Sequence, residues 1–158
     1  MANGYMGKIL NVNLSTGTLS DEVIADDILR DYVGGYGLAA RLLNERMPGG
    51  VDPLGPENLL AFFTGPLTGS PSIEGNRWVV CCKSPLTGGW GDANCGGTFG
   101  PALKGAGYDG VICSGISEKP VYLLLDDGKP SLHDASELWG QDSNEAEEAL
   151  QKLSLIHI

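Results

Sequence analysis

The residues best suited to chemistry lie between Gly75 and Gly100, in the segment GNRWVVCCKSPLTGGWGDANCGGTFG. One cation, Arg77, and one side-chain amide, Asn94, stand there among many glycines. Glycine has no Cβ, so its backbone N–H groups can approach a ligand closely, as in loops that bind phosphate. A guanidinium can bind phosphate through two hydrogen bonds, and an amide oxygen suits a hard metal ion that bridges phosphates. The segment therefore predicts a surface for a large phosphorylated ligand.

Each of these residues also has a simpler explanation. Arg77 follows a Gly-Asn turn at the start of an expected strand, where a surface arginine is unremarkable. Asn94 precedes Cys95, Gly96 and Gly97, and it could merely occupy a left-handed turn position. Cys95 could be reactive or bind a metal, but the sequence offers it no partner, which favours an uncommitted thiol. The glycines around Arg77 and Asn94 favour the functional interpretation.

Catalytic residues cannot be assigned from the remaining polar side chains. The sequence contains no nucleophile with a recognisable base, no Walker loop and no dinucleotide fingerprint. Asp92 and Asp109 could be paired acids, but nothing determines their separation, and we interpret them as turn residues. Lys83 and Lys104 fit anion contacts and solvated charges equally well, and His133 is typical of a surface residue. The reactive atoms are therefore expected from a cofactor or from sequence outside this chain.

The composition limits the class of protein. The 158 residues, 42% of them hydrophobic, suffice for one domain or for part of a larger one. Ten basic and twenty acidic residues give a net charge of -10, which opposes nucleic acid or an anionic membrane as a partner. The apolar runs are much shorter than the ~20 residues that cross a bilayer. Because MANGYMGKIL lacks the pattern of a secretory signal, we expect a cytoplasmic location.

The four cysteines show no Cys-x-x-Cys spacing of the kind that holds zinc or an iron–sulfur cluster. We expect reduced thiols. Cys81 and Cys82 are adjacent in an expected strand, so their side chains should face opposite sides, with one of them buried. Cys113 lies in the apolar run VICSGI. Core packing is the predicted role of these three residues.

A hairpin and two helical stretches are predicted first along the chain. Residues 8–24 alternate as two strands around a turn that contains Gly17. A helix follows, with Asp26 or Asp27 as its N-cap, and a second helical stretch covers 35–47 after the Gly34-Gly35 interruption. The residues of that stretch expected in the core are Leu38, Leu42 and Leu43.

Buried strands are predicted next. Two similar turns, GPLTG and SPLTG, each follow one of them, and both turns are expected at the same edge of a sheet. The expected elements are strands at 59–64, 77–83 and 110–116 and a glycine loop from residue 94 that enters a short helix at 101–104.

A second hairpin at 121–133 and an acidic helix from 143 echo the first hairpin and its helix. An internal duplication and a chance similarity explain this echo equally well. If the unit is duplicated, its second copy lacks a following apolar strand, which predicts a domain over 1–153 that is truncated at its C-terminus. Residues 154–158, SLIHI, resemble a non-native tail, so His157 receives no role.

Several segments taken in order resemble one known family. They are GKILNVNLSTG, VGGYGLAARLL, VDPLGPENLLAFFTGPLTGS, the glycine-rich segment extended to ICSG, and KPVYLLL with LHDASELWG. This order is similar to the N-terminal domain of tungsten-containing aldehyde ferredoxin oxidoreductases, from Gly7 to Leu153. The resemblance implies a strand-rich α+β base domain on which a bis-pterin cofactor of tungsten, or of molybdenum, rests.

The same resemblance implies which residues bind that cofactor. The family's cofactor-binding arginine of a Gly-x-Arg turn corresponds to Arg77. Its asparagine of an Asn-x-Gly-Gly loop, which helps hold a magnesium ion bridging the two pterin phosphates, corresponds to Asn94. The implied cofactor contacts are thus Arg77, Asn94, Cys95, Gly96 and Gly97. Cys95 stands where many relatives are expected to have serine, which is compatible with a contact made by the backbone.

The implied reaction oxidises an aldehyde to a carboxylic acid and passes two electrons through a 4Fe-4S cluster to ferredoxin. The cluster ligands are expected beyond Leu153, so this segment is expected to be inactive by itself, in an anaerobic cytoplasm. A homodimer of the full-length protein is left open. Relatives act on other substrates such as aromatic coenzyme A thioesters, and a free-standing module that binds a phosphorylated ligand or assists assembly, without redox activity, is the alternative function.

Overall fold

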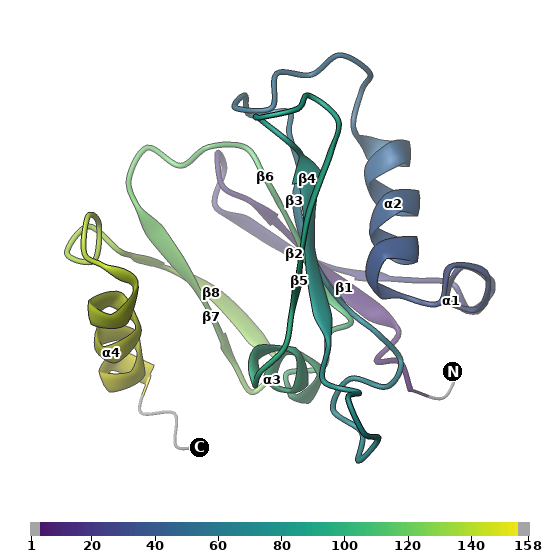
Figure 1. Cartoon of the computed structure of the whole chain (residues 1–158). Helices are drawn as coiled ribbons and strands as arrows, with labels where there is room; N and C mark the ends of the chain where they lie inside the picture. Colours follow the sequence, from purple (N-terminus) through teal and green to yellow (C-terminus); the bar gives the residue numbers. More distant parts are fainter. Residues whose placement is uncertain (1–3, 155–158) are drawn as a thin grey trace.

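A six-stranded mixed sheet forms the centre of the computed structural model, which describes residues 4–154 (Figure 1). The strand order is β2-β1-β6-β3-β4-β5; β1 and β6 run parallel and the other neighbours antiparallel. A second, two-stranded sheet pairs β7 with β8. In chain order the elements are β1 (Lys8–Asn13), β2 (Thr18–Val23), α1 (Asp26–Tyr32), α2 (Gly35–Arg46), β3 (Leu60–Thr64), β4 (Trp78–Lys83), β5 (Trp90–Cys95), α3 (Phe99–Gly105), β6 (Gly110–Ser114), β7 (Val121–Asp126), β8 (Lys129–Asp134) and α4 (Ser143–Ser154). The predicted α+β class is confirmed.

The first hairpin is confirmed, but the N-cap predicted for the helix after it is wrong. The side chain of Asn13 accepts the backbone N–H groups of Ser15 and Thr16 and so stabilises the β1–β2 turn. Helix α1 begins after Ala25, whose extended backbone occupies the N-cap position without a side-chain cap. Asp26 and Asp27 lie instead in the first helical turn, where their negative charges interact favourably with the positive end of the helix dipole.

Helix α2 covers one face of the six-stranded sheet (Figure 1). Leu38, Leu42 and Leu43 are buried against the sheet, as their helical spacing predicts. Phe63 of β3 and Ile112 of β6 lie in the same core cluster. Burial of this apolar surface is the main stabilising contribution on this side of the sheet.

The opposite face of the sheet packs against α3 and the second hairpin (Figure 1). The predicted β7–β8 hairpin is confirmed, with Val121 opposite Asp134. Its Leu123, Leu125 and Leu132 pack against a core cluster that includes Tyr108. Side chains from one face of the hairpin therefore pack into this second core, although the hairpin does not pair with the six-stranded sheet.

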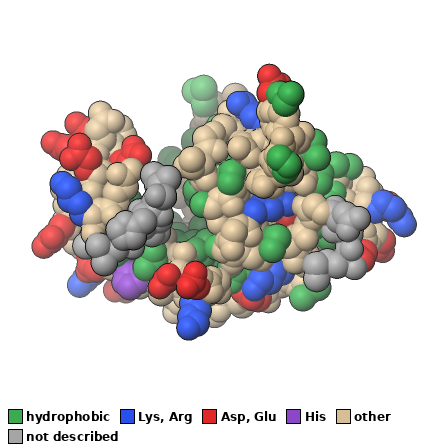
Figure 2. Space-filling view, turned by 90° about the horizontal axis from the view of Figure 1, so that it is seen from below, with side chains coloured by type: hydrophobic (Ala, Val, Ile, Leu, Met, Phe, Trp, Pro, Cys, Tyr) green, Lys and Arg blue, Asp and Glu red, His purple; other side chains and the backbone are tan. Residues whose placement is uncertain are grey.

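The acidic helix is confirmed as α4, which begins at Ser143 and includes Ser154. Asp142 caps it, since its carboxylate accepts the backbone N–H groups of Asn144 and Glu145. Figure 2 shows acidic side chains gathered over this helix at the left of the view. The rest of the predicted non-native tail, 155–158, lies outside the described residues. The internal duplication stays a prediction.

The expected position of the two similar turns is wrong. Strands β3 and β4 are antiparallel neighbours, with Thr64 opposite Trp78 and Ala61 opposite Cys81. The turn after β3 therefore lies at the opposite end of the sheet from the turn after β4. Similar turn sequences alone did not reveal the direction of the strands before them.

Strand β5 was missed by the sequence analysis, which placed its last residues in a loop. It pairs with β4 along its whole length, from Lys83 opposite Trp90 to Trp78 opposite Cys95. Glycine, aspartate and asparagine are depleted in strands, and this edge strand contains all three. Asn94 and Cys95 are thus strand residues, and α3 is longer than its predicted four residues. No helix within residues 4–154 is long and apolar enough to cross a membrane.

A candidate cofactor-binding site at the edge of the sheet

Arg77 and Asn94 are in direct contact at the edge of the six-stranded sheet. The Arg77 Nε–H donates to Asn94 Oδ1 at 2.6 Å, and Nη2 donates to the Asn94 backbone oxygen at 3.3 Å. Arg77 directly precedes β4, and Asn94 lies opposite Val79 in the adjacent β5. The antiparallel pairing of the two strands thus brings together two residues that the sequence singled out separately.

The Arg77 guanidinium is available to an anion. Both Arg77 and Asn94 are exposed. Among the described residues, 4–154, no carboxylate forms an ion pair with Arg77. Its partner is a neutral amide, which orients the guanidinium but leaves its positive charge uncompensated. In a chain of net charge -10, this guanidinium without a carboxylate partner is suited to contact a phosphate.

The glycines after β5 present bare backbone next to this cation. A Cβ on Gly96 would lie 3.4 Å from Arg77 Nη1, so a larger residue would crowd the guanidinium. Gly97 has a φ of +78° and nothing within 4 Å of the place of a Cβ. Such a backbone favours glycine and leaves room for a ligand. Arg77, Asn94 and Gly96 are thus brought together as predicted, with Gly97 beside them.

Cys95 differs from its neighbours because its side chain faces away from Asn94. Successive side chains of a strand point to opposite sides of the sheet. Asn94 pairs with Val79, which belongs to the core cluster covered by α2, whereas Cys95 pairs with Trp78 on the other side. The Cys95 thiol therefore points away from the Arg77–Asn94 contact. A contact of Cys95 with a ligand on the Arg77 side would have to use its backbone.

Tyr36 of α2 is a site residue that the sequence analysis missed. It lies beside Asn94 and Asp92, which are two residues apart on the same side of β5. Interaction with Asn94 lowers the pKa of Tyr36, but desolvation and the Asp92 carboxylate outweigh that effect, and the pKa is raised overall. The phenol thus stays protonated as a hydrogen-bond donor at neutral pH. Its position between glycines in GGYG was the signal that could have revealed it.

Within the described part of the chain, no group of three or more histidine, cysteine or carboxylate side chains could hold a metal ion. The candidate metal ligand at this site is instead a single amide oxygen. Asn94 Oδ1 accepts one hydrogen bond from Arg77, and an amide oxygen has two lone pairs. One lone pair remains for a hard cation such as magnesium, which commonly keeps phosphate oxygens among its ligands.

The two candidate lysines have structural roles instead. Lys83 Nζ donates to the Val51 carbonyl at 2.5 Å. Lys104 is buried, lies 3.1 Å from Asp109 Oδ1 and donates to the Gly4 carbonyl. Neither lysine is a solvated charge, and the anion that Lys104 contacts is the protein's own Asp109 carboxylate. Asp109, expected in a turn, does lie before β6, but it is fully buried and ion-paired.

His133 is a surface residue, as predicted. Its side chain is exposed and its ring stacks on Tyr122, with centroids 5.2 Å apart. Its Nε2 also shares a hydrogen bond of 2.8 Å with the Ser131 hydroxyl. These neighbours give it no role at the candidate site.

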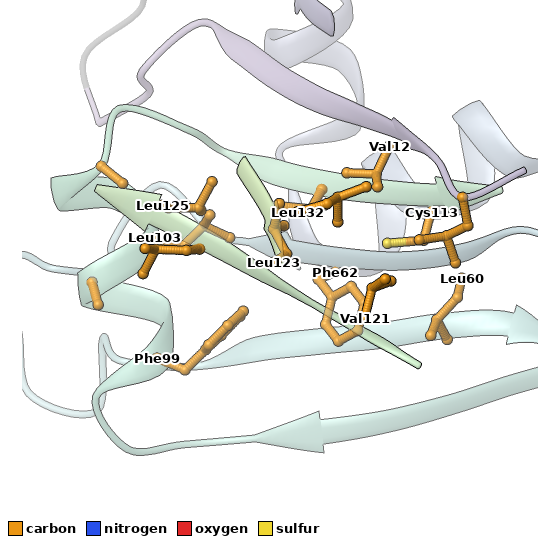
Figure 3. Close-up of a pocket in the computed structure, with 15 residues that line it drawn as sticks. Val12, Leu60, Phe62, Phe99, Leu103, Cys113, Val121, Leu123, Leu125 and Leu132 are labelled. Atoms are coloured by element: carbon orange, nitrogen blue, oxygen red, sulfur yellow. The ribbon is translucent and has the colours of Figure 1, made fainter. Parts of the chain in front are cut away.

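A large apolar cavity lies elsewhere, between the six-stranded sheet and the β7–β8 hairpin (Figure 3). Its volume is about 490 Å³, and its lining consists of Leu, Val, Ala and Phe side chains with the Cys113 thiol. No charged side chain lines it, so it is unsuited to a phosphorylated ligand. Phe62 and Phe99 line its wall and pack against Trp78, and Arg77 is not among the residues that line it.

All four cysteines are free, and Cys81 and Cys113 hold their protons tightly. Burial, with smaller contributions from Asp92 and Cys82, raises the pKa of Cys81 from its ordinary value of 9.0 to about 12. Burial raises the pKa of Cys113 to about 11. Cys81 is buried and the adjacent Cys82 only partly so, which confirms that their side chains face opposite ways.

These raised pKa values predict a loss of stability in alkali. The folded thiols keep protons that the unfolded thiols release above pH 9, so their contribution is fully present below about pH 9 and lost as the pH rises towards 11 and 12. The urea midpoint should therefore fall between about pH 8 and about pH 10.5. The urea midpoint of Cys113→Ala should fall less over that interval, because this variant lacks one of the two thiols. Equal decreases in the variant and the unmodified protein would contradict the assignment.

Comparisons with known proteins were consistent with one another. A family model described as "Aldehyde ferredoxin oxidoreductase, N-terminal domain" matches residues 9–156. The chain is 44% identical over 149 residues to a tungsten-containing aldehyde ferredoxin oxidoreductase of Pyrococcus abyssi, covering 94% of this chain and 24% of that protein. The corresponding protein of Thermococcus kodakarensis is 45% identical, with 94% and 25% covered. The chain thus spans about a quarter of the length of these relatives.

Two further similarities involve different substrates. The WOR-like subunit of an aliphatic sulfonate oxidoreductase of Pyrococcus furiosus is 36% identical over 151 residues, covering 94% of this chain and 24% of that protein. The solved structure of the BamBC active-site complex of benzoyl coenzyme A reductase, with 1,5 dienoyl-CoA, contains a chain that is 36% identical. Its TM-score is 0.95, and the match covers 98% of this chain and 24% of that one. The same fold therefore occurs within a much longer polypeptide.

Proposed function

Because the chain belongs to the aldehyde ferredoxin oxidoreductase family, we propose that its sheet edge at Arg77 and Asn94 binds the phosphates of a tungsten pterin cofactor. The resemblance inferred from the sequence motifs is confirmed at family level. The single observation that carries the proposal is the Arg77–Asn94 contact, in which a guanidinium is oriented by an amide and has no carboxylate partner among residues 4–154.

The described residues fit such a group. Arg77 would bind a phosphate oxygen through the Nη1 edge that faces Gly96. Asn94 would offer its remaining lone pair to a magnesium ion that accompanies the pterin phosphates. Gly96 and Gly97 would leave the backbone open to the ligand, and Cys95 would contribute backbone only. These residues bind and orient the cofactor, and none of them transfers a proton.

The cofactor supplies the redox chemistry when it is bound. We infer that the full-length protein oxidises aldehydes to carboxylic acids and passes the electrons through a 4Fe-4S cluster to ferredoxin. The higher identity to aldehyde oxidoreductases than to the sulfonate-related subunit supports an aldehyde as substrate. Because the chain spans a quarter of these relatives, the substrate pocket and cluster ligands would lie outside it, and this segment alone would be inactive.

Replacing Arg77 tests the assignment. Removing a charge-assisted phosphate bond should weaken cofactor binding by about 1.5–3 kcal/mol, or about tenfold to a hundredfold. Full-length protein with Arg77→Ala should therefore retain less tungsten per polypeptide after extensive dialysis, measured by mass spectrometry of the metal. When both proteins are grown without tungstate, its urea midpoint should match that of the unmodified protein, because Arg77 is exposed.

The matched control is Arg30→Ala, since Arg30 is an exposed arginine whose ion pair within residues 4–154 is with the adjacent Asp31 at 2.9 Å. This variant should keep the tungsten content of the unmodified protein. Equal tungsten content in Arg77→Ala and Arg30→Ala would reject the proposed role of Arg77. A free-standing binding module would instead bind phosphorylated ligands in the 158-residue chain without any tungsten.

A further inference from the structure

We propose that Trp78 is a positioning residue that aims the backbone N–H of Gly97 at the ligand phosphate; this inference rests on the proposed function. The indole Nε1–H of Trp78 donates to the carbonyl oxygen of Gly96 at 2.8 Å. Gly96 directly follows Cys95, the last residue of β5. The indole therefore fixes the position of the first residue after β5, which the pairing of β5 with β4 no longer fixes.

The indole ring is itself held from several sides. Its centroid lies 4.4 Å from that of Phe99 and 6.3 Å from that of Phe62. Gly100 leaves space for it, because a Cβ there would lie 3.2 Å from Trp78 Cδ1. Phe62 and Phe99 extend this packing into the wall of the apolar cavity (Figure 3). A ring packed in this way gives its N–H a defined direction.

The direction of the Gly96 carbonyl determines the direction of the next N–H. In a trans peptide the C=O of one residue and the N–H of the next point to opposite sides of the chain, and the described chain contains no cis peptide. Trp78 and Arg77 are successive residues, so their side chains lie on opposite sides of the sheet. With its carbonyl on the Trp78 side, Gly96 directs the N–H of Gly97 towards the Arg77 side.

The Gly97 N–H is free to bind a ligand. Within residues 4–154 it donates to no protein acceptor. Gly97 has a positive φ, and glycine has no side chain to restrict its backbone conformation, so the hydrogen bond to Gly96 is what orients this peptide. A backbone N–H and a guanidinium are both donors that bind phosphate oxygens well. Trp78 itself does not contact the ligand in this arrangement; it acts on the ligand through Gly96 and Gly97.

The test uses Trp78→Phe in the full-length protein, which removes the N–H donor but keeps an aromatic ring. In a crystal structure of Trp78→Phe grown without tungstate, the peptide between Gly96 and Gly97 should no longer keep one orientation, because the Gly96 carbonyl has lost its donor. In protein grown with tungstate, Trp78→Phe should retain about tenfold less cofactor after dialysis, measured as tungsten per polypeptide. Trp139→Phe is the matched control, because Trp139 is an exposed tryptophan on the loop before α4.

An unchanged single orientation of the Gly96–Gly97 peptide, or unchanged tungsten content in Trp78→Phe, would overturn the inference. The test separates this failure from failure of the proposed function. If Arg77→Ala loses tungsten while Trp78→Phe keeps it, the cofactor site stands and the positioning role of Trp78 falls. If Arg77→Ala also keeps its tungsten, the proposed cofactor site itself is wrong.

Discussion

Replacing Asp109 with alanine should lower the free energy of unfolding by about 3–5 kcal/mol, because it leaves a buried lysine without its counter-charge. Asp109 is 2% exposed, and its Oδ1 lies 3.1 Å from Lys104 Nζ. The carboxylate also accepts the backbone N–H groups of Met6 at 3.1 Å and Gly7 at 2.7 Å. One substitution would thus remove an ion pair and the anchor of the N-terminal segment together.

Urea unfolding of Asp109→Ala, compared with Asp109→Asn and Lys104→Met, would measure this effect. Asp109→Asn keeps the side-chain volume and an acceptor for one backbone N–H, so it should cost less than alanine. In the double variant Asp109→Leu with Lys104→Met, no charge stays buried, and part of the lost stability should return. A loss below about 1 kcal/mol for Asp109→Ala would show that the buried pair is not the anchor described here.

The second large effect is expected at Phe63, whose truncation to alanine should cost about 3–5 kcal/mol. Phe63 is fully buried in β3, where its neighbours in the sheet are Val79 and Gly110. Its ring lies over Gly110, since a Cβ there would come within 2.5 Å of the ring. Glycine offers no side chain that could move into the space left by the ring, so most of the cavity should persist.

Thermal or urea unfolding with two controls would check this prediction. Phe63→Leu leaves a smaller cavity and should cost less than half as much as alanine. Ile73→Ala removes an apolar side chain that is 93% exposed and should change the stability by less than about 0.5 kcal/mol. Similar losses in Phe63→Ala and Ile73→Ala would contradict the central position of Phe63 in the core.

Elements with a strong local pattern were predicted well. Both hairpins have alternating strands around a short turn, and α2 has its leucines at helical spacing. Strand β5 lacks such a pattern, because its glycine, aspartate and asparagine favour loops. It is a strand because β4 offers a free edge to pair with. The position of the turns after β3 and β4 also depends on that pairing and not on their own sequence.

The roles of Lys104 and Asp109 had no local signal either. The two residues are five positions apart, but their burial depends on Met6 and Gly7, which are more than one hundred positions away from Asp109. A charged residue in a short loop is usually solvated. Only the folding of the N-terminal segment over this pair makes it a structural anchor.

The sequence by itself determined the family, the α+β class and the residue types able to contact phosphate, because ordered motifs and hydrophobic periodicity are local properties of the chain. Only the tertiary structure decided that Arg77 touches Asn94, that Cys95 faces the other side, and that Trp78 holds Gly96. The physical reason is register: these contacts join residues about eighteen positions apart, and the pairing of β4 with β5 selects which of them meet.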